Sequence, residues 1–251
     1  MSIRKKIVIV GATSLIAQHC ARLWLREAAV DLVLVGRDEE RIGVVADDLR
    51  VRNPGCNISV KILADFMDVS EIGGLAQQVA DQRRVDILLI AHGSLPVQSE
   101  CQEYLDICRS ALETNGLSPV LFAEAFAKQM EKQNHGTIAL IGSVAGDRGR
   151  RSNYVYGAAK GMIDRYAQGL RHRFAGKALK VVLVKPGPTD TPMTASMKDR
   201  GARLAPVENV AKEIVDGIYR GNSIIYSPRK WRVIMWIIVR IPDVIFKKLN
   251  I

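Results

Sequence analysis

The stretch KIVIVGATS, residues 6–14, decides the fold. Its apolar run ends at Val10, which is the length of a buried strand, and Gly11 permits a tight turn. A helix-like stretch follows to Glu27, and a second apolar run at residues 31–35 closes a βαβ unit. Because the helix N-terminus then points at the turn, the unit is the minimal arrangement that binds a nucleotide phosphate.

Thr13 and Ser14 stand where the chain enters that first helix. They offer hydroxyls as well as backbone N–H groups to a phosphate. Both residue types are also common helix N-caps. The two interpretations are compatible, and both stay open.

The rest of the chain repeats this alternation. Apolar runs begin near Ile7, Leu32, Ile58, Ile87, Ile138, Val181 and Ile224, with helix-length segments between them. The pattern predicts an α/β fold with a doubly wound parallel sheet of about seven strands. At 251 residues the chain can bury one large core, so we expect one domain over residues 1–226, followed by an apolar, basic helical tail over residues 227–251.

Tyr156-Gly157-Ala158-Ala159-Lys160 predicts a proton-transfer site. On a helix, Tyr156 and Lys160 are i and i+4 and share one face, so the ammonium lies below the phenol and lowers its pKa from about 10. Ser143 follows the apolar run at residues 137–141 and could reach the same carbonyl oxygen as Tyr156. Such a trio suits a general acid/base that acts on a ketone or alcohol. The pair alone is a weak signal, since a surface tyrosine and lysine share this spacing by chance.

Together these pieces resemble the short-chain dehydrogenase/reductase family, in its order, from Lys5 to Thr191. The resemblance implies a Rossmann-like fold and an NAD(P)-dependent oxidoreductase that interconverts a ketone and a secondary alcohol by hydride transfer. It also implies four catalytic residues: Asn115, Ser143, Tyr156 and Lys160. In these roles Tyr156 moves the proton and Ser143 orients the substrate. Lys160 contacts the nicotinamide ribose, and Asn115 holds a water that links Lys160 to solvent.

The resemblance further implies a set of cofactor-binding positions, and no metal. They are Gly11, Thr13, Ser14, Leu15, Ile16, Arg37, Asp65, Phe66, Ala91, His92, Gly93, Tyr156, Lys160, Pro186, Gly187, Thr189 and Thr191. The family's glycine motif TGxxxGxG falls on Val10, Gly11, Leu15 and Ala17, so only its first glycine is present. Leu15 adds a side chain where the family brings bare backbone close to pyrophosphate.

Two later motifs also bear on the cofactor. The family's Asn-Asn-Ala-Gly appears as Ile90-Ala91-His92-Gly93, which keeps Gly93 alone. His92 either touches the cofactor or is a satisfied, partly buried histidine. Pro186-Gly187 with Thr191 matches the family's PGxxxT, whose threonine contacts the carboxamide, although a Pro-Gly pair also makes an ordinary turn.

The second strand indicates which cofactor is bound. It ends Gly36-Arg37, with no carboxylate before Asp38. A carboxylate there would accept the ribose hydroxyls of NAD, whereas a guanidinium suits the extra phosphate of NADP. The sequence therefore favours NADP(H) over NAD(H), with Arg37 stacked on adenine or facing water as the alternatives.

The C-terminal stretch at residues 227–242 predicts a helix that is apolar almost all round. Its longest apolar run is seven residues, far short of the roughly 20 that span a bilayer. Residues 229–251 carry six Lys/Arg and one Asp, about half of the formal net charge of +10. Trp231 and Trp236 beside these cations suit an interfacial helix on anionic lipid. The alternative is a helix packed on the subunit or on its symmetry mate, with its cations snorkelling to water.

The loop Gly146-Asp147-Arg148-Gly149-Arg150-Arg151 lies between the serine and the tyrosine, where the family places the substrate mouth. One inward guanidinium there would indicate an anionic substrate. A solvated loop or an oligomer contact is the alternative. Residues 191–206, which form a lid in this family, do not reveal the ligand.

Within the family, the chain looks like the keto-sugar reductases related to the second subunit of decaprenylphosphoryl-ribose 2-epimerase. That likeness implies a substrate that is a keto-sugar or similar polar compound, linked to a polyprenyl phosphate. Two other functions stay open. One is a soluble dehydrogenase of small ketones or steroid-type alcohols, and the other is a non-enzymatic NAD(P)-binding regulator.

Composition completes the expectations. The four cysteines show no metal spacing and no cleavable signal segment precedes the first strand, which favours the cytoplasm, with a peripheral position at the inner face of the membrane as an extension. No aromatic-interleaved basic patch lies outside the tail, so we expect no nucleic-acid partner. The resemblance implies a homodimer or homotetramer, formed through residues 99–133 and 154–174.

Overall fold

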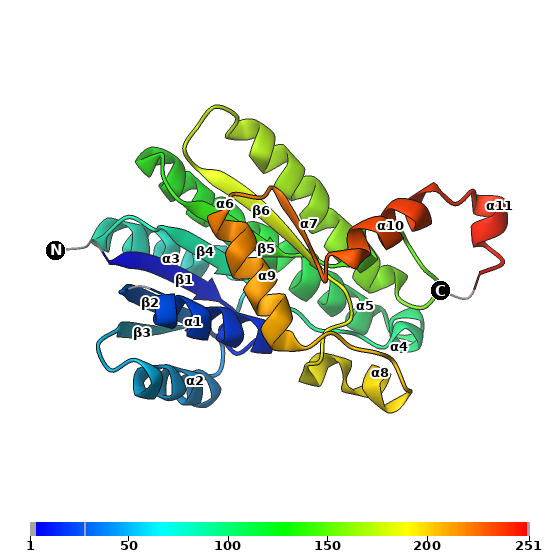
Figure 1. Cartoon of the computed structure of the whole chain (residues 1–251), viewed down its shortest axis with the longest axis horizontal. Helices are drawn as coiled ribbons and strands as arrows, with labels where there is room; N and C mark the ends of the chain where they lie inside the picture. The colour runs from blue at the N-terminus through cyan, green and yellow to red at the C-terminus, as the bar shows by residue number, and fades with distance from the viewer. Residues whose placement is uncertain (1–3, 28, 250–251) are drawn as a thin grey trace.

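Seven parallel strands form the centre of the fold in the order β3-β2-β1-β4-β5-β6-β7. The computed structural model describes residues 4–27 and 29–249 (Figure 1). The strands are β1 (Lys5–Val10), β2 (Val30–Gly36), β3 (Asn57–Ile62), β4 (Ile87–Ile90), β5 (Thr137–Ile141), β6 (Lys180–Pro186) and β7 (Ile224–Ser227). Each begins within two residues of its predicted start, so the expected doubly wound, Rossmann-like sheet is confirmed.

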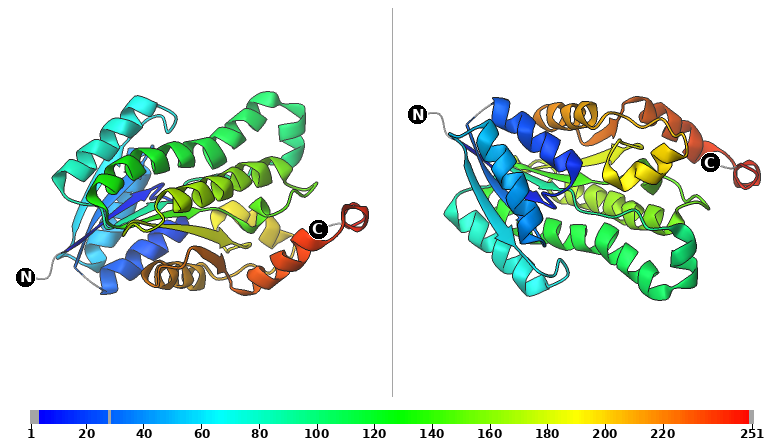
Figure 2. Two further views of the ribbon diagram at one scale, coloured as in Figure 1. Left: turned by 90° about the horizontal axis from the view of Figure 1, so that it is seen from above. Right: turned by 90° about the horizontal axis from the view of Figure 1, so that it is seen from below.

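Helices cover both faces of the sheet (Figure 2). One layer holds α1 (Leu15–Glu27), α2 (Glu39–Arg52) and α9 (Val207–Tyr219), and the other holds α3 (Val69–Gln82), α6 (Ser118–Gln133) and α7 (Tyr154–Arg173). Shorter helices lie at the end to which the strands point: α4 (Gln98–Glu103), α5 (Leu105–Leu112), α8 (Ala195–Asp199), α10 (Lys230–Arg240) and α11 (Asp243–Phe246). Three other helical turns are η1 (Glu113–Leu117, a π-helix), η2 (Val144–Gly146) and η3 (Pro192–Thr194).

The core explains why the strands read as apolar runs without alternation. Side chains on one face of the sheet pack with α1, α2 and α9 around Trp24, and those on the other face pack with α3, α6 and α7 around Phe122 and Phe126. Both faces of a central strand are therefore buried, as is usual in all-parallel sheets. This geometry leaves the strand ends as the place for polar side chains.

The chain order reverses between β1 and β4, which are neighbours in the sheet. At such a switch point the loops after the two strands diverge and open a crevice, where α/β proteins bind ligands. Gly11 follows β1 directly, and the loop at residues 91–97 follows β4. The sequence motifs for phosphate binding therefore meet at the edge where a ligand site is expected.

The C-terminal segment, residues 229–249, forms α10 and α11 at that same end of the molecule (Figure 1). A helix is present in the predicted stretch 227–242, but α10 covers only Lys230–Arg240, since Ser227 still belongs to β7 and Ile241-Pro242 separates α10 from α11. Within residues 4–27 and 29–249, no helix combines the length and hydropathy that crossing a bilayer requires. The outermost ends of the expected domain and tail, residues 1–3 and 250–251, lie outside the described residues.

Candidate active site

Three of the predicted catalytic side chains line one cavity, the tyrosine cavity, at the carboxyl ends of β4, β5 and β6. Tyr156 stands in the first turn of α7, and Lys160 follows one turn later with its Nζ 5.7 Å from the Tyr156 ring centroid. Lys160 is buried, and its Nζ donates a hydrogen bond to the carbonyl oxygen of Ile141 at 3.0 Å. Ser143 follows β5 by two residues and lies beside the phenol. The i, i+4 arrangement expected from the sequence is present.

The protonation of this group differs from the sequence expectation. Burial raises the pKa of Tyr156 to about 12, and the hydrogen bond with Ser143 offsets only part of that rise. Burial also lowers the pKa of Lys160 to about 8. The expected lowering of the phenol pKa by Lys160 does not occur, because removal from water outweighs nearby favourable contacts. Tyr156 therefore stays protonated near neutrality, the form that can donate a proton to a carbonyl oxygen.

Asn115 lies in the π-helix η1, between α5 and α6, and is completely buried. Its Nδ2 donates to the carbonyl of Ala111 at 2.9 Å, and its Oδ1 accepts from the backbone N–H of Ser94 at 2.8 Å. A Cβ at Gly93 would lie 2.9 Å from Asn115 Oδ1 and 3.6 Å from Lys160 Nζ. Gly93 thus lets the loop after β4 sit directly over both residues. Single π-helical turns are frequent at functional sites.

The turn after β1 has a conformation and a neighbour that both require glycine. Gly11 has a φ of 80°, and a Cβ there would lie 2.5 Å from the backbone nitrogen of His92. Close packing of these two loops leaves the N-terminus of α1 facing the crevice. Ser14 and Ile16, from the start of α1, line the tyrosine cavity, so this turn and the catalytic residues share one site.

His92 supports that packing. Its Nε2 lies 2.9 Å from Ser118 Oγ, which donates its own hydrogen to the carbonyl of Phe66 at 2.8 Å. The Ser118 hydroxyl has one hydrogen, so Nε2 must be the donor, and Nδ1 carries the lone pair. Burial, followed by the charges of Lys160 and Arg37, lowers the pKa of His92 to about 3, so the ring is neutral. The Nε2 atom of His92 therefore has a hydrogen-bond partner within the protein. Its Nδ1 is buried without a partner among the described residues and remains an acceptor for a ligand.

The departures from the family's glycine motif do not close the crevice. Leu15 lines a separate cavity with His19 and Thr191, outside the tyrosine cavity. Ala17 is fully buried against the sheet, where its methyl group is accommodated by core packing. The pyrophosphate position expected at Gly11 therefore keeps both its turn and its helix N-terminus.

Arg37 directly follows the carboxyl end of β2. Arg37 is exposed, and its guanidinium lies 5.7 Å from the ring centroid of Phe66. Phe66 in turn packs edge-on against His92 at 5.0 Å. The carboxylate of Asp38 accepts from the backbone N–H of Arg41 as the N-cap of α2. Asp65 is also exposed, and its Oδ1 accepts from the N–H of Met67.

The segment after β6 forms the remaining wall. Thr189 is buried and its hydroxyl donates to the carbonyl of Gly187 at 2.9 Å, and Thr191 begins η3. Residues 191–206 contain η3 and α8, and Met193 and Met197 from these turns line the tyrosine cavity. Pro186-Gly187 is more than a turn, because both residues line the cavity as well.

Trp231 is a cavity residue that sequence reasoning missed. It belongs to the first turn of α10, and its indole packs so closely on Gly187 that no Cβ would fit there. The sequence placed this tryptophan in a tail, and no local pattern signals a contact across more than forty residues. The C-terminal segment therefore begins inside the site.

The three arginines of the loop between Ser143 and Tyr156 have different positions. Arg148 contacts the C-terminal segment, Arg151 is exposed, and Arg150 lines the tyrosine cavity. The Nε of Arg150 is buried without a hydrogen-bond partner among the described residues, and so is the neighbouring Oδ1 of Asn153, another cavity residue that the sequence did not indicate.

A buried ion cluster holds this loop in place. The Nζ of Lys185, on β6, lies 2.5 Å from Asp147 and 2.6 Å from Asp164 on α7. Tyr226, on β7, donates to the other oxygen of Asp147 at 2.8 Å. Burial alone would lower the pKa of Lys185, but the two carboxylates raise it, so the lysine is charged. The cluster ties the catalytic loop to two strands and one helix.

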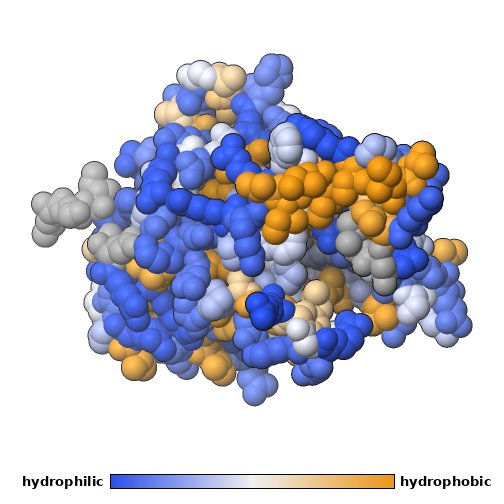
Figure 3. Space-filling model, turned by 45° about the vertical axis from the view of Figure 1, so that its right-hand side comes forward, coloured by the Kyte–Doolittle hydropathy of each residue, from blue (hydrophilic) through white to orange (hydrophobic). Residues whose placement is uncertain are grey.

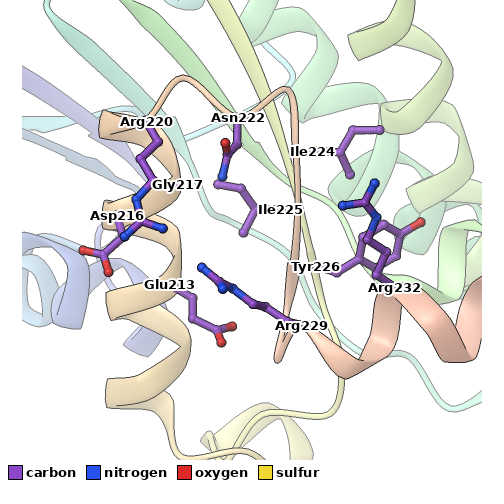
Figure 4. A pocket seen from close by; sticks show the side chains of 10 residues that line it. All are labelled: Glu213, Asp216, Gly217, Arg220, Asn222, Ile224, Ile225, Tyr226, Arg229 and Arg232. Atoms are coloured by element: carbon purple, nitrogen blue, oxygen red, sulfur yellow. The ribbon is translucent and has the colours of Figure 1, made fainter.

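A second cavity opens at the sheet edge between α9, β7 and the start of α10 (Figure 4). Glu213, Asp216, Arg220, Arg229 and Arg232 are its charged side chains. Two carboxylates stand against three guanidiniums in this cavity, and none of the predicted catalytic residues lines it.

The fold is that of a doubly wound α/β protein, with a tyrosine and a buried lysine in a cavity at the carboxyl ends of its strands. Comparison with known sequences agrees: residues 5–201 match the short chain dehydrogenase family. The chain belongs to the short-chain dehydrogenase/reductase family, whose members act on CH–OH groups.

Individual relatives are distant. An uncharacterised oxidoreductase of Streptomyces coelicolor is 28% identical over 248 residues, which cover 98% of this chain and 96% of the relative. A short chain dehydrogenase from Burkholderia cenocepacia, solved in complex with NADP, has a TM-score of 0.82 at 18% identity and 100% coverage of both chains. A 3-oxoacyl-[acyl-carrier protein] reductase from Brucella melitensis, in complex with NAD, has a TM-score of 0.78 at 21% identity, covering 90% of this chain and 96% of the other. At these identities the solved structures support the fold alone.

Proposed function

We propose that this protein is an NADPH-dependent reductase that converts the ketone of a polar substrate, a keto-sugar or a similar compound, to a secondary alcohol. One observation carries the proposal: Tyr156, beside Ser143 and one helical turn from Lys160, lines a cavity at the dinucleotide crevice, where burial raises its pKa. The nicotinamide would supply the hydride. Tyr156 would donate the proton to the alkoxide oxygen, and Ser143 would hold that oxygen in place.

The proton that Tyr156 gives up must be replaced. Lys160 is the nearest ionisable group on the same face, and Asn115 lies close to it beneath Gly93. Since the Asn115 amide is already bonded to Ala111 and Ser94, a backbone group of η1 is better placed to hold the relay water. Asn115 would then act by fixing the π-helical turn.

Arg37 supports NADPH rather than NADH. It is the exposed cation at the end of β2, and Asp38, the carboxylate that follows it in the chain, serves as a helix cap. A neighbouring fold holds NADP and another holds NAD, so the fold permits both. We expect Arg37→Gln to lower the preference of kcat/KM for NADPH over NADH about tenfold, the contribution of one charge-assisted hydrogen bond. An unchanged ratio would remove Arg37 from this role.

Arg150 supports an anionic substrate, whereas the unpartnered Oδ1 of Asn153 is an acceptor that suits a hydroxyl group of the substrate. Both present unpartnered buried polar atoms at the wall of the tyrosine cavity, and unsatisfied buried groups are expected to find a ligand or water. A phosphate beside the ketone would accept from Arg150. We expect Arg150→Met to raise KM for a phosphorylated keto-sugar about tenfold or more and to leave the unphosphorylated ketone unaffected. Arg151→Met is the matched control, because it makes the same substitution at an exposed arginine of the same loop.

The finer substrate proposal is a polyprenyl-phosphate-linked keto-sugar, as the likeness to the epimerase-linked reductases suggests. Apolar side chains at the mouth, Met193, Met197 and Trp231, support a lipid that leaves the cavity there. The test compares NADPH oxidation with free and with polyprenyl-linked keto-sugars. Equal turnover of both would favour the soluble small-ketone dehydrogenase instead.

The non-enzymatic regulator is tested by cofactor binding alone. It draws on the two absent glycines, but Leu15 and Ala17 leave the crevice open. We expect NADPH to bind and to be oxidised when a ketone is added. Absence of binding at about millimolar NADPH, far above the usual affinity of such sites, would contradict the enzyme.

Assembly and location remain part of the proposal. We propose a homodimer or homotetramer formed through the layer of α5, α6 and α7, without a nucleic-acid partner, in the cytoplasm. Leu105 on α5 and Met162 on α7 are exposed apolar side chains on these helices and support such a contact. Residues 1–226 would form the catalytic domain, and residues 227–251 would serve a peripheral contact with the inner face of the membrane.

A further inference from the structure

The outer face of the C-terminal segment exposes large apolar side chains. On α10, Val233, Trp236 and Ile237 are 62%, 59% and 51% exposed, and on α11 Val244 and Ile245 are 75% and 54% exposed. Figure 3 shows a continuous hydrophobic band on the face of the molecule that carries this segment. We call these five residues the docking surface. Contiguous exposed apolar patches on a folded chain mark sites of interaction.

The fold does not need these side chains. The opposite side of α10 already anchors the helix: Met235 is buried, and Trp231 packs on Gly187 in the tyrosine cavity. Since i and i+4 share a helix face, Trp231 and Met235 point inward together while Val233 and Ile237 point outward together. The helix is therefore apolar on two sides, only one of which is used within the chain.

The C-terminal segment that carries the docking surface is rich in cations, of which Arg229 and Arg232 line the sheet-edge cavity. Residues 229–249 contain six of them, Arg229, Lys230, Arg232, Arg240, Lys247 and Lys248, against a single carboxylate, Asp243. That carboxylate is paired with Arg148. The guanidinium of Arg240 lies 4.3 Å from the ring centroid of Trp236, at the border between the apolar and basic groups. Trp beside Arg and Lys around an apolar stripe is the composition of helices that lie in a membrane interface.

Arg148 fixes the segment in this orientation. Its Nη1 donates to the carbonyls of Ile238 at 2.7 Å and Ile241 at 2.5 Å, which satisfies free carbonyl groups at the C-terminus of α10. Its Nη2 pairs with Asp243 at 2.7 Å, and the guanidinium stacks 3.7 Å from the ring centroid of Phe246. One side chain thus holds both helices and the bend between them.

Arg148 also belongs to the catalytic loop. It follows Ser143 by five residues and precedes Tyr156 by eight, and Asp147 beside it is anchored by Lys185. The docking surface is therefore held rigidly next to the mouth of the tyrosine cavity, through the loop at one end and Trp231 at the other.

We propose that the docking surface binds an anionic lipid bilayer and sets the mouth of the tyrosine cavity towards it. The orientation rests on the proposed function, whereas the binding itself does not. A second copy of the chain fits less well, because a symmetric contact would bring cations of this segment, such as Arg240, close to the same cations of the other copy in a desolvated interface. Anionic headgroups would neutralise these cations instead.

The test is co-sedimentation of the full chain with phosphatidylcholine vesicles, with and without phosphatidylglycerol. We expect binding to the anionic vesicles only, and Trp236→Glu/Ile237→Glu to weaken it at least about tenfold, the effect of removing two apolar side chains from the lipid. Lys247→Gln/Lys248→Gln should weaken it less. Val51→Glu, an exposed apolar position on α2, is the control and should bind as the wild type does.

Several results would overturn the proposal. The first is a wild-type protein that does not bind anionic vesicles, and the second is a Trp236→Glu/Ile237→Glu variant that binds them as well as the wild type does. The third is a variant that forms a smaller oligomer in light scattering while the wild type does not bind vesicles. The last would assign the surface to a second copy. NADPH oxidation with a water-soluble ketone, measured without lipid, reports on the proposed function separately, so failure of one leaves the other result intact.

Discussion

The tyrosine cavity and the C-terminal segment depart from the usual distribution of polar and apolar groups in opposite directions. The cavity buries ionisable groups: Lys160 is 3% exposed, and burial moves the pKa of both Tyr156 and Lys160. The C-terminal segment exposes apolar groups that the core does not require. Both departures cost folding free energy or solubility, and in an otherwise ordinary α/β core they are the places where function is expected. Substitutions in the cavity should therefore have large effects on activity or stability, and substitutions of the exposed apolar groups should have small ones.

Tyr156→Phe removes the proton donor and keeps the ring. We expect kcat to fall about 10²–10⁴-fold, the usual contribution of a general acid, while the affinity for NADPH changes little. Steady-state kinetics and fluorescence titration of NADPH measure the two quantities. Retained turnover would contradict the acid role of the phenol.

Lys185→Met tests the buried ion cluster below the catalytic loop. It leaves Asp147 and Asp164 buried without a counter-charge, so we expect the free energy of unfolding to fall by about 3–5 kcal/mol. Urea denaturation measures it. The control is Lys198→Met, which breaks the exposed pair with Asp190 and should cost less than about 1 kcal/mol. Equal costs would show that the cluster does not hold the loop.

The pH dependence of ketone reduction should report Lys160. With a pKa of about 8, Lys160 is protonated below that pH and can return a proton to Tyr156, whereas above it the lysine is neutral. We therefore expect kcat/KM to be level below pH 8 and to fall about tenfold per unit above it. Lys160→Met should lose this bend along with most activity. A rate that rises through pH 8 would reverse the assigned role.

The smallest effect is expected where the exposed apolar groups are removed. Trp236→Glu/Ile237→Glu should change the free energy of unfolding by less than about 0.5 kcal/mol, as is usual for exposed positions. Met235→Ala, on the inward face of the same helix, should cost about 2–5 kcal/mol. Thermal and urea unfolding of both variants measures this contrast. A large cost for the first variant would mean that the docking surface has a structural role.

The sequence predicted the strands well because most of them contain a short apolar run, and β1 and β5 are followed directly by glycine. The pairing of Tyr156 with Lys160 was also predictable, since it follows from helical periodicity alone. Two features of the site could not be predicted: the hydrogen bond from Lys160 to Ile141 and the π-helical turn at Asn115. Both depend on tertiary contacts that no local pattern encodes.

What the sequence could not resolve were contacts between distant segments. In the sequence, nothing distinguishes the three arginines of the loop, Arg148, Arg150 and Arg151. The structure distinguishes them, because Arg148 contacts Ile238, ninety residues away, whereas Arg150 lines the tyrosine cavity. Trp231 had no signal that would place it against Gly187. The pKa of Tyr156 was misjudged for the same reason, because the sequence shows a nearby lysine but not the burial that outweighs it.

We propose that ketone reduction and membrane binding depend on different side chains. The most direct test measures two variants, Tyr156→Phe and Trp236→Glu/Ile237→Glu, in two assays. The assays are reduction of a water-soluble ketone without lipid and sedimentation with phosphatidylglycerol-containing vesicles. We predict that the first variant loses turnover and keeps vesicle binding, and that the second keeps turnover and loses vesicle binding. A single variant that loses both, while folded and able to bind NADPH, would contradict the separation.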